Sequence, residues 1–403
     1  MSTEQSLALA DRLSRMAESA TIKMASMARE LKAQGHDVIS LSLGEPDFDT
    51  PDHIKEAAKK ALDEGYTKYT PVPGLLELRE AVCTKLKRDN NISATPNQIV
   101  VSNGAKQSIA NICMALLNPG DEVIVLAPYW VSYSEIIKLA EGKAVILGAS
   151  IEEDYKVSAD NIEAAITDRT KAILFSSPCN PTGSVYTSDE LKAIAEVVQR
   201  HENIHIIADE IYEYINFTEE GHSSIGAFPE VADRTITVNG FSKGFAMTGW
   251  RLGYMAAPLP VAKACGKIQG QITSGATAFG QKAAAYALLA DMKPTHDMRA
   301  AFLQRRDMML ELLSEIPGMQ VNQPKGAFYI FPNITAFFGK QHAGGTIQNA
   351  DDFCEYLLHK AHVAVVTGEA FGAPNCFRIS YASSEAELRE AVKRMKAALT
   401  ELQ

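Results

Sequence analysis

The sequence has few cysteines and no long apolar run, and both absences narrow the class of protein. Its 403 residues include six cysteines, none of which falls in a CxxC pair or in a spacing typical of metal ligands. Scattered thiols of this kind are typical of a reducing compartment. No segment approaches the roughly 20 apolar residues of a membrane span, and the N-terminus lacks the pattern of a signal peptide. We therefore expect a cytoplasmic protein that is neither secreted nor membrane-bound.

Basic residues are fewer than acidic residues. The chain has 39 basic and 49 acidic residues, and its formal net charge of -10 argues against nucleic acid as a partner. The phosphate-binding signatures GxGxxG and GxxxxGKS/T are missing, which disfavours a nucleotide-binding α/β protein. With 46% hydrophobic and 22% charged residues, the chain is typical of a globular protein with a large core.

One long segment lacks acidic residues altogether. Between Arg234 and Ala290 there is no Asp or Glu, although the segment holds six basic residues. Lys243 lies here in the stretch NGFSKGFAMTGWRLGY, among apolar side chains and close in sequence to Arg251. A lysine in such surroundings has a lowered pKa, so its neutral amine attacks a carbonyl carbon and forms a Schiff base. The alternative interpretation, a solvated surface lysine, fits the other lysines of the segment better.

Short apolar runs alternate with amphipathic helical patterns along most of the chain. The alternation predicts an α/β fold with a mostly parallel sheet buried on both faces. After about residue 295 a long helix, a strand, a helix at 351–361, a second strand and a last helix predict a smaller α+β domain. The last helix begins with a capping box, Ser384 and Glu387. The expected sheet strands are 98–103, 121–128, 143–149, 170–178, 203–209, 235–240 and 251–257.

Residues suited to binding one ligand follow the ends of these expected strands. Ligands of open parallel sheets bind beyond the carboxyl ends of the strands. Gly104 and Ala105 begin a helix there, where free backbone N–H groups and the helix dipole hold a phosphate. Trp130 offers a flat ring for stacking. The other residues at strand ends are Asn180, Asp209, Tyr212, Ser242 and Lys243.

Together these groups match pyridoxal 5′-phosphate, which is an aldehyde on a pyridinium ring with a phenolate oxygen and a phosphate. Each motif alone has a commoner explanation: a tight turn, a core aromatic side chain, a chain reversal or a helix cap. Their order along the chain and their convergence on one sheet edge favour the cofactor.

The sequence resembles the class I aminotransferases, which are fold-type I pyridoxal-phosphate enzymes, and within them the bacterial aspartate/prephenate aminotransferase branch. The stretches that carry the likeness are SATI, SLGEPDFDTP, YTKYTPVPG, SNGAKQS, APYWVSY, SPCNPTG, ADEIY, SKGFAMTGWRLGY and FRISYA. The resemblance implies a seven-stranded sheet in the large domain and amino-group exchange between aspartate or glutamate and their 2-oxo acids. The alternatives are conversion of prephenate to arogenate or another amino-acid specificity of the same fold.

The resemblance also implies a role for each cofactor residue. Lys243 binds the cofactor aldehyde and then moves the proton of the substrate carbon. Asp209 keeps the ring nitrogen protonated, while Tyr212 and Asn180 donate hydrogen bonds to the ring oxygen. Trp130 stacks on the ring. The phosphate is expected on Gly104, Ala105, Ser242 and Arg251.

Substrate recognition is expected to use both domains. The resemblance places the substrate α-carboxylate on Arg378, whose planar guanidinium suits a bidentate contact. Gly44 would line the substrate side, together with Trp130 and Asn180. The branch resembled binds the distal carboxylate with the lysine of the SNGAK stretch, so the resemblance implies that Lys106 binds this group with help from Thr21.

Tyr69 resembles the family tyrosine that reaches the phosphate of the neighbouring subunit, so the resemblance implies a homodimer with shared active sites. The expected segments are 1–48, which joins the small domain and covers the active site, 49–294, the large cofactor-binding domain, and 295–403, the small domain.

Several alternatives stay open. Lys106 lies one residue past the expected phosphate cradle, so it could instead add charge to the phosphate. Many members of the branch carry a lysine just before SATI, but this chain has Ala17 and Glu18 there, which leaves aspartate and prephenate undecided. Motifs shared across the fold also leave open an enzyme of elimination or decarboxylation. A non-catalytic relative is disfavoured because the lysine is present. No metal site is expected.

Overall fold

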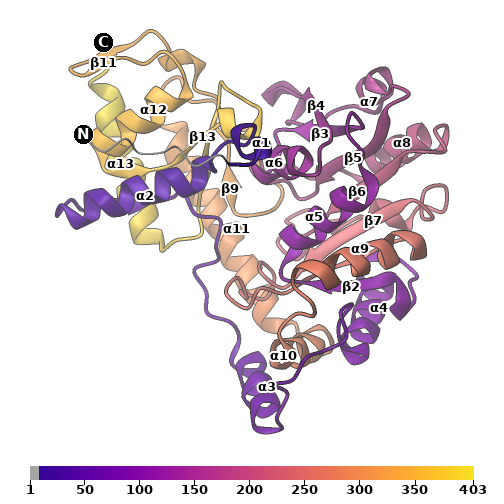
Figure 1. Ribbon diagram of the computed structural model, residues 1–403. Helices are drawn as coiled ribbons and strands as arrows, with labels where there is room; N and C mark the ends of the chain where they lie inside the picture. The colour runs from indigo at the N-terminus through magenta and orange to yellow at the C-terminus, as the bar shows by residue number, and fades with distance from the viewer. Residues whose placement is uncertain (1–8) are drawn as a thin grey trace, which may run out of the picture.

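The structure, a computed structural model that describes residues 9–403, has a larger and a smaller lobe (Figure 1). The larger lobe is built on a seven-stranded sheet with the strand order β2-β8-β7-β6-β5-β3-β4. Only β8 runs antiparallel to its neighbours within this sheet, so the prediction of a mostly parallel sheet is confirmed. The strands are β2 (Ile99–Ser102), β3 (Glu122–Ala127), β4 (Lys143–Gly148), β5 (Thr170–Ser176), β6 (His205–Asp209), β7 (Thr235–Gly240) and β8 (Gly253–Ala256).

Helices cover both faces of this sheet. Alternate residues of β3 face opposite layers, because Val123 and Val125 belong to a core with α5, α6 and α9, whereas Ile124 and Leu126 pack with α7 and α8. Burial on both faces explains why the strand sequences are nearly continuous apolar runs. The helices of this lobe are α3 (Asp52–Asp63), α4 (Leu76–Asn90), α5 (Ala105–Leu116), α6 (Ser132–Leu139), α7 (Ala159–Ala165), α8 (Ser188–Gln199), α9 (Leu259–Ile272) and α10 (Ala278–Leu289), with short 3-10 turns at Pro96–Gln98, Ile151–Glu153 and Ile225–Ala227.

The smaller lobe joins both ends of the chain. Strand β1 (Ile39–Ser40) pairs in parallel with β12 (Val363–Ala364), and α2 (Ala20–Ala33) contributes Met24 to the same core. A second, antiparallel sheet has the order β13-β14-β9. Its strands are β9 (Tyr329–Ile330), β13 (Val366–Thr367) and β14 (Phe377–Ser380), and the hairpin of β10 (Gln341–His342) and β11 (Gly345–Thr346) lies apart.

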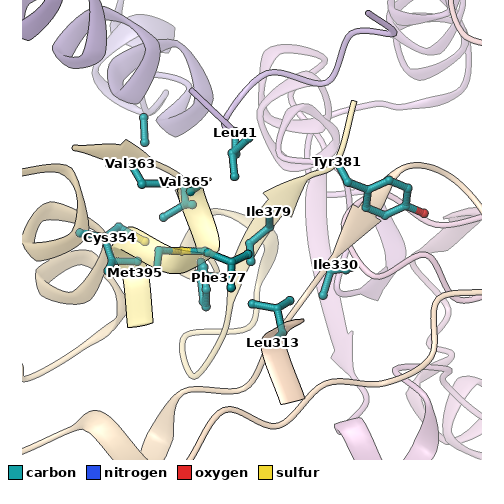
Figure 2. Packing of buried hydrophobic residues seen from close by; sticks show 14 of the residues in the cluster. Leu41, Leu313, Ile330, Cys354, Val363, Val365, Phe377, Ile379, Tyr381 and Met395 are labelled. Atoms are coloured by element: carbon teal, nitrogen blue, oxygen red, sulfur yellow. The ribbon is translucent and has the colours of Figure 1, made fainter. Parts of the chain in front are cut away.

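The core of this lobe is shown in Figure 2, where Phe377 and Ile379 of β14 point toward Leu313 and Met395. These last two residues come from α11 (Lys293–Ser314) and α13 (Glu385–Thr400). Half of the predicted capping box of α13 is present, because Ser384 Oγ accepts the N–H of Glu387 at 3.3 Å. The Glu387 carboxylate accepts the hydroxyl of Ser384 at 3.4 Å in place of its backbone N–H. The remaining elements are α1 (Asp11–Ser14), α12 (Ala350–Tyr356), a π-helical turn at Leu357–Ala361, and 3-10 turns at Thr335–Phe337 and Glu369–Phe371.

No helix within residues 9–403 is both long enough and apolar enough to span a membrane.

Candidate active site

A cavity of about 360 Å³ opens where strands of the large sheet end and the two lobes meet. Most of the residues expected at the site line it, and they come from both lobes. The predicted residues that line this cavity are Thr21, Gly44, Ala105, Lys106, Trp130, Asn180, Asp209, Tyr212, Ser242, Lys243, Arg251 and Arg378.

Lys243 follows β7, and its ammonium group donates a hydrogen bond to the carbonyl oxygen of Gly44. Burial lowers the pKa of Lys243 to about 8. The carboxylate of Glu45 opposes this change, while Arg378 and Arg251 add to it. A lysine with this pKa is a neutral amine in a large fraction of molecules near pH 8, as a nucleophile and proton carrier requires.

Asp209 ends β6 and is buried in the floor of the cavity. Its Oδ2 accepts a hydrogen bond of 2.7 Å from the hydroxyl of Tyr133, and its Oδ1 accepts the backbone N–H of Ile211 at 3.2 Å. Burial raises the pKa of Asp209 to about 6, against the lowering effect of the Tyr133 hydrogen bond. A buried carboxylate without a positive partner is unfavourable, so this site favours a cationic group on the ligand.

Tyr133 is a site residue that the sequence analysis missed. It lies three positions after Trp130 in the stretch APYWVSY, on the first turn of α6, and the centroids of the two rings are 5.5 Å apart. Its hydrogen bond to Asp209 joins residues that are 76 positions apart, so local sequence held no signal for it.

A cradle for a small anion lies at the N-terminus of α5. Gly104 has φ +85°, and a Cβ there would lie 2.3 Å from the guanidinium of Arg251. A Cβ on Gly253 would lie 2.3 Å from the backbone nitrogen of Ala105. Gly104 is therefore required by the close approach of Arg251, and Gly253 by the close approach of β8 to the start of α5. Free N–H groups, the helix dipole and a cation together suit a phosphate, and Ser242 adds a hydroxyl that faces the same cavity.

Arg378 belongs to β14 of the smaller lobe and lines the same cavity. Its side chain is only 2% exposed. Its Nη1 donates to Asn180 Oδ1 at 2.9 Å and its Nη2 to the Ser42 carbonyl at 2.6 Å. The rings of Tyr329 and Phe371 lie 4.5 and 4.9 Å from the guanidinium carbon. The Nε atom is buried without a hydrogen-bond partner among the described residues.

Tyr329 also escaped the sequence analysis. Its hydroxyl lies 2.7 Å from that of Tyr212, and a Cβ on Gly44 would lie 2.3 Å from it. Gly44 is thus needed because the tyrosine hydroxyl occupies the space of a side chain. The tyrosine comes from a two-residue strand whose sequence gives no catalytic pattern, so local sequence held no signal for it.

Lys106 and Thr21 complete the mouth of the cavity. The Lys106 ammonium lies 4.9 Å from the centroid of the Trp130 ring. Burial and the nearby Arg251 lower the pKa of Lys106. No carboxylate of residues 9–403 forms an ion pair with Lys106, so its charge remains available for a ligand. Tyr69, by contrast, lies outside this cavity and is 99% exposed.

Comparison with known proteins identifies the family. The model of the aminotransferases of class I and II matches residues 36–395. The chain belongs to this family. A bifunctional aspartate aminotransferase and glutamate/aspartate-prephenate aminotransferase of Petunia hybrida is 47% identical over 98% of this chain and 84% of its own. An aspartate/prephenate aminotransferase of Cereibacter sphaeroides is 46% identical over 96% and 98%.

Solved structures agree with this assignment. The aspartate aminotransferase of Rhizobium meliloti superposes with a TM-score of 0.96 at 41% identity, covering 98% of this chain and 100% of its own. That of Thermus thermophilus with maleate gives 0.91 at 40% identity over 97% and 100%.

Membership in the family makes the protein an aminotransferase that depends on pyridoxal phosphate. The residues present fit this cofactor, because one cavity combines a lysine of lowered pKa, a buried carboxylate that forms no ion pair within residues 9–403, and an anion cradle that a Cβ would fill. When bound, the cofactor supplies an aldehyde for the amino group and a ring that withdraws electrons.

Proposed function

We propose that this aminotransferase exchanges amino groups between aspartate or glutamate and the corresponding 2-oxo acids, oxaloacetate and 2-oxoglutarate. The observation that carries the proposal is that two cations from different lobes, Arg378 of β14 and Lys106 of α5, line the cavity that contains Lys243. A substrate with two carboxylates satisfies both cations. The similar structure from Thermus thermophilus was solved with maleate, which is a dicarboxylate.

In this proposal Arg378 binds the α-carboxylate, which every amino-acid and 2-oxo-acid substrate shares. Its guanidinium is fixed by Asn180 and Ser42 and flanked by two rings, so little side-chain entropy is lost when the substrate binds. The fixed guanidinium orients the Cα–H bond of the substrate.

Lys243 then performs the proton transfer. Its neutral amine would accept the proton from the substrate Cα and hold it for return to the bound substrate. Asp209, kept in place by Tyr133, holds a proton on the ring nitrogen by its negative charge. Tyr212 lies on the turn just after Asp209, where its hydroxyl is near the ring oxygen in our proposal. The cradle of Gly104, Ala105, Ser242 and Arg251 would hold the phosphate, and Trp130 would stack on the ring.

Prephenate is the second candidate substrate, because similar proteins from Petunia hybrida and Cereibacter sphaeroides are named for prephenate as well as aspartate. Prephenate also carries two carboxylates, so Lys106 would serve it in the same way. Thr21, on α2 at the mouth of the cavity, is the residue that we assign to help Lys106.

We further propose a homodimer in which Tyr69 reaches the phosphate of the neighbouring subunit. The exposed ring of Tyr69 supports this proposal, because an aromatic side chain that is 99% exposed in one chain suits contact with another. Leu62, Tyr66 and Leu76 of the same region also expose apolar surface.

We also propose that the chain divides into the segments 1–48, 49–294 and 295–403, and that the domains which they form close on the substrate when it binds. We place the enzyme in the cytoplasm, since all six cysteines are free.

The test is the catalytic efficiency, kcat/KM, for aspartate, glutamate, alanine, phenylalanine and prephenate in the wild type and in Lys106→Ala. Loss of one charged contact costs about 1.5–3 kcal/mol, which is roughly ten- to a hundredfold in kcat/KM. We expect this loss for the dicarboxylic substrates and not for alanine or phenylalanine. Lys192→Ala, which removes an exposed lysine of α8, is the matched control and should change none of them.

An equal loss for all five substrates would assign Lys106 to the phosphate. A wild type that is indifferent to dicarboxylates would refute the proposed substrate class.

A further inference from the structure

A buried group of charged side chains lies behind the turn that carries Asp209 and Tyr212. Asp209 and Tyr212 line the cavity, whereas the intervening Glu210 and the following Glu213 do not. These two glutamates are 2% and 6% exposed. A carboxylate is rarely buried without positive partners, so their partners bear on how the turn is held.

The partners come from α4 and from the loop before the 3-10 turn at Ile225–Ala227. The ammonium group of Lys85, which is 0% exposed, pairs with Glu213. The Nε2 atom of His222 lies 3.0 Å from Glu210 Oε2. Neutral donors complete the set, since Asn90 Nδ2 lies 3.0 Å from Glu210 Oε2 and 2.9 Å from Glu213 Oε2, and Ser224 Oγ donates to Glu210 Oε2 at 2.7 Å.

The charges in this group balance only when His222 is an imidazolium. Glu210 and Glu213 carry two negative charges, and Lys85 carries one positive charge. A neutral His222 would leave one negative charge buried without compensation, which is strongly unfavourable. A divalent metal ion beside His222 would lie close to the ammonium group of Lys85, so the arrangement favours a proton over a metal.

We propose that His222 is a positioning residue that stays protonated in the folded enzyme and, through Glu210, fixes the turn that carries Asp209 and Tyr212. The neighbouring Glu210 backbone supports this coupling, because its N–H donates to the Val238 carbonyl at 2.8 Å and so ties the turn to β7. A shift of Glu210 would move the adjacent Asp209 carboxylate away from the cofactor ring.

The titration of His222 agrees with the geometry. Burial lowers the pKa of His222, but the carboxylates of Glu210 and Glu213 outweigh burial and the opposing charge of Lys85, so the pKa is raised. A histidine whose pKa is raised on folding contributes stability that is fully present below its unfolded pKa of about 6.5. That stability is lost as the pH rises through the folded pKa.

The test compares the melting temperature, Tm, of the holoenzyme and of His222→Gln at pH 6 and pH 9. The Tm that His222→Gln loses at pH 6 should exceed the Tm that it loses at pH 9 by roughly 2 °C or more. His205→Gln is the matched control at the other end of β6, because burial lowers the pKa of His205 and its pH dependence should run the opposite way. The double variant Glu210→Gln/His222→Gln restores charge balance and should lose less Tm at pH 6 than His222→Gln alone.

Two further readouts separate positioning from simple structural support. The kcat of His222→Gln should fall while KM for the amino donor changes little, since Arg378 belongs to the other lobe. In histidine-selective NMR of the wild type, one imidazole should remain protonated well above pH 6.5.

An equal Tm loss at both pH values would overturn the proposal, as would the absence of such an imidazole among the nine histidines. Stabilisation by added Zn²⁺ that disappears in His222→Gln would show a metal site and would overturn it as well. None of these measurements of stability involves the amino-acid substrate, so they fail or succeed separately from the proposed function.

Discussion

The two walls of the active-site cavity differ in how the chain builds them. On the wall from the large lobe, Asp209 and Lys243 follow the ends of adjacent parallel strands, and the N-terminus of α5 forms the anion cradle. On the wall from the small lobe, Thr21, Gly44 and Arg378 come from three segments that are far apart in sequence. The first wall therefore follows from the topology of a parallel sheet, whereas the second depends on tertiary packing.

The walls also differ chemically. The large lobe offers a lysine of lowered pKa and a carboxylate of raised pKa, which are the groups of proton transfer. The small lobe offers a guanidinium held by Asn180 and Ser42, which our proposal assigns to recognition of the substrate carboxylate. The comparison implies that changes in the large lobe should impair the chemistry for every substrate, while changes in the small lobe should impair substrate affinity.

Lys243→Ala should have the largest effect. Removing the amine that, in our proposal, transfers the proton should lower kcat by about 10⁴-fold for every substrate, with the fold retained. Steady-state turnover and far-UV circular dichroism measure the two effects. Lys263→Ala, an exposed lysine of the same acid-free segment, is the control and should behave as the wild type. If Lys243→Ala transaminated at the wild-type rate, the assignment of Lys243 as the catalytic lysine would be wrong.

Arg378→Ala should sharpen the contrast between the walls. Loss of a buried charged contact costs about 2–5 kcal/mol, which corresponds to roughly 30-fold or more in the KM of every amino-acid and 2-oxo-acid substrate. Affinity for pyridoxal 5′-phosphate should be nearly unchanged, as measured by titration of the apoenzyme. The opposite pattern, with substrate affinity intact and cofactor affinity lost, would show that Arg378 binds the cofactor and not the substrate carboxylate.

Asp209→Asn should retain the cofactor and slow the chemistry. Without a negative charge near the ring nitrogen, loss of the substrate Cα proton should slow by about 10²–10³-fold. Single-turnover kinetics with Cα-deuterated aspartate measures this step directly. An unchanged rate of Cα-proton loss would show that Asp209 only caps the following turn and does not act on the cofactor ring.

Tyr133→Phe should have the smallest effect and should appear as a pH dependence. Burial raises the pKa of Asp209 from 3.8 to about 6, so the apoenzyme gains stability from the protonated carboxyl group at low pH and loses it as the pH rises through 6. Removing the hydroxyl of Tyr133 deletes a hydrogen bond that lowers this pKa. The loss of stability should therefore extend to higher pH, with a hydrogen bond to a charged group contributing about 1.5 kcal/mol.

Thermal unfolding of the apoenzyme between pH 4 and pH 8 measures this change. Asp209→Asn is its control, because it has no carboxyl group to titrate at this position. Identical pH profiles for Tyr133→Phe and the wild type would show that the hydroxyl does not act on Asp209.

The sequence predicted the large lobe better than the small one, for physical reasons. The strands of the large sheet are short, mostly apolar runs, so all seven were located, and the ends of two of them marked Asp209 and Lys243. Helices α9 and α10 were not located, because α10 is apolar on most of its surface and lacks the alternation of an exposed helix. A residue such as Arg378 reads as an ordinary arginine on a strand, and only the resemblance to a family pointed to it. Tyr133 and Tyr329 act through contacts between distant segments, which no local pattern encodes.

The central claim is that Lys243 holds the cofactor on the wall of the large lobe. Reduction of the purified holoenzyme with borohydride fixes the cofactor to the lysine that carries it, and mass spectrometry of the peptides then locates the modified residue. We predict a single phosphopyridoxyl group on Lys243, with none on Lys106. A phosphopyridoxyl group on any other lysine, or no modified lysine in an enzyme that contains the cofactor, would contradict this account.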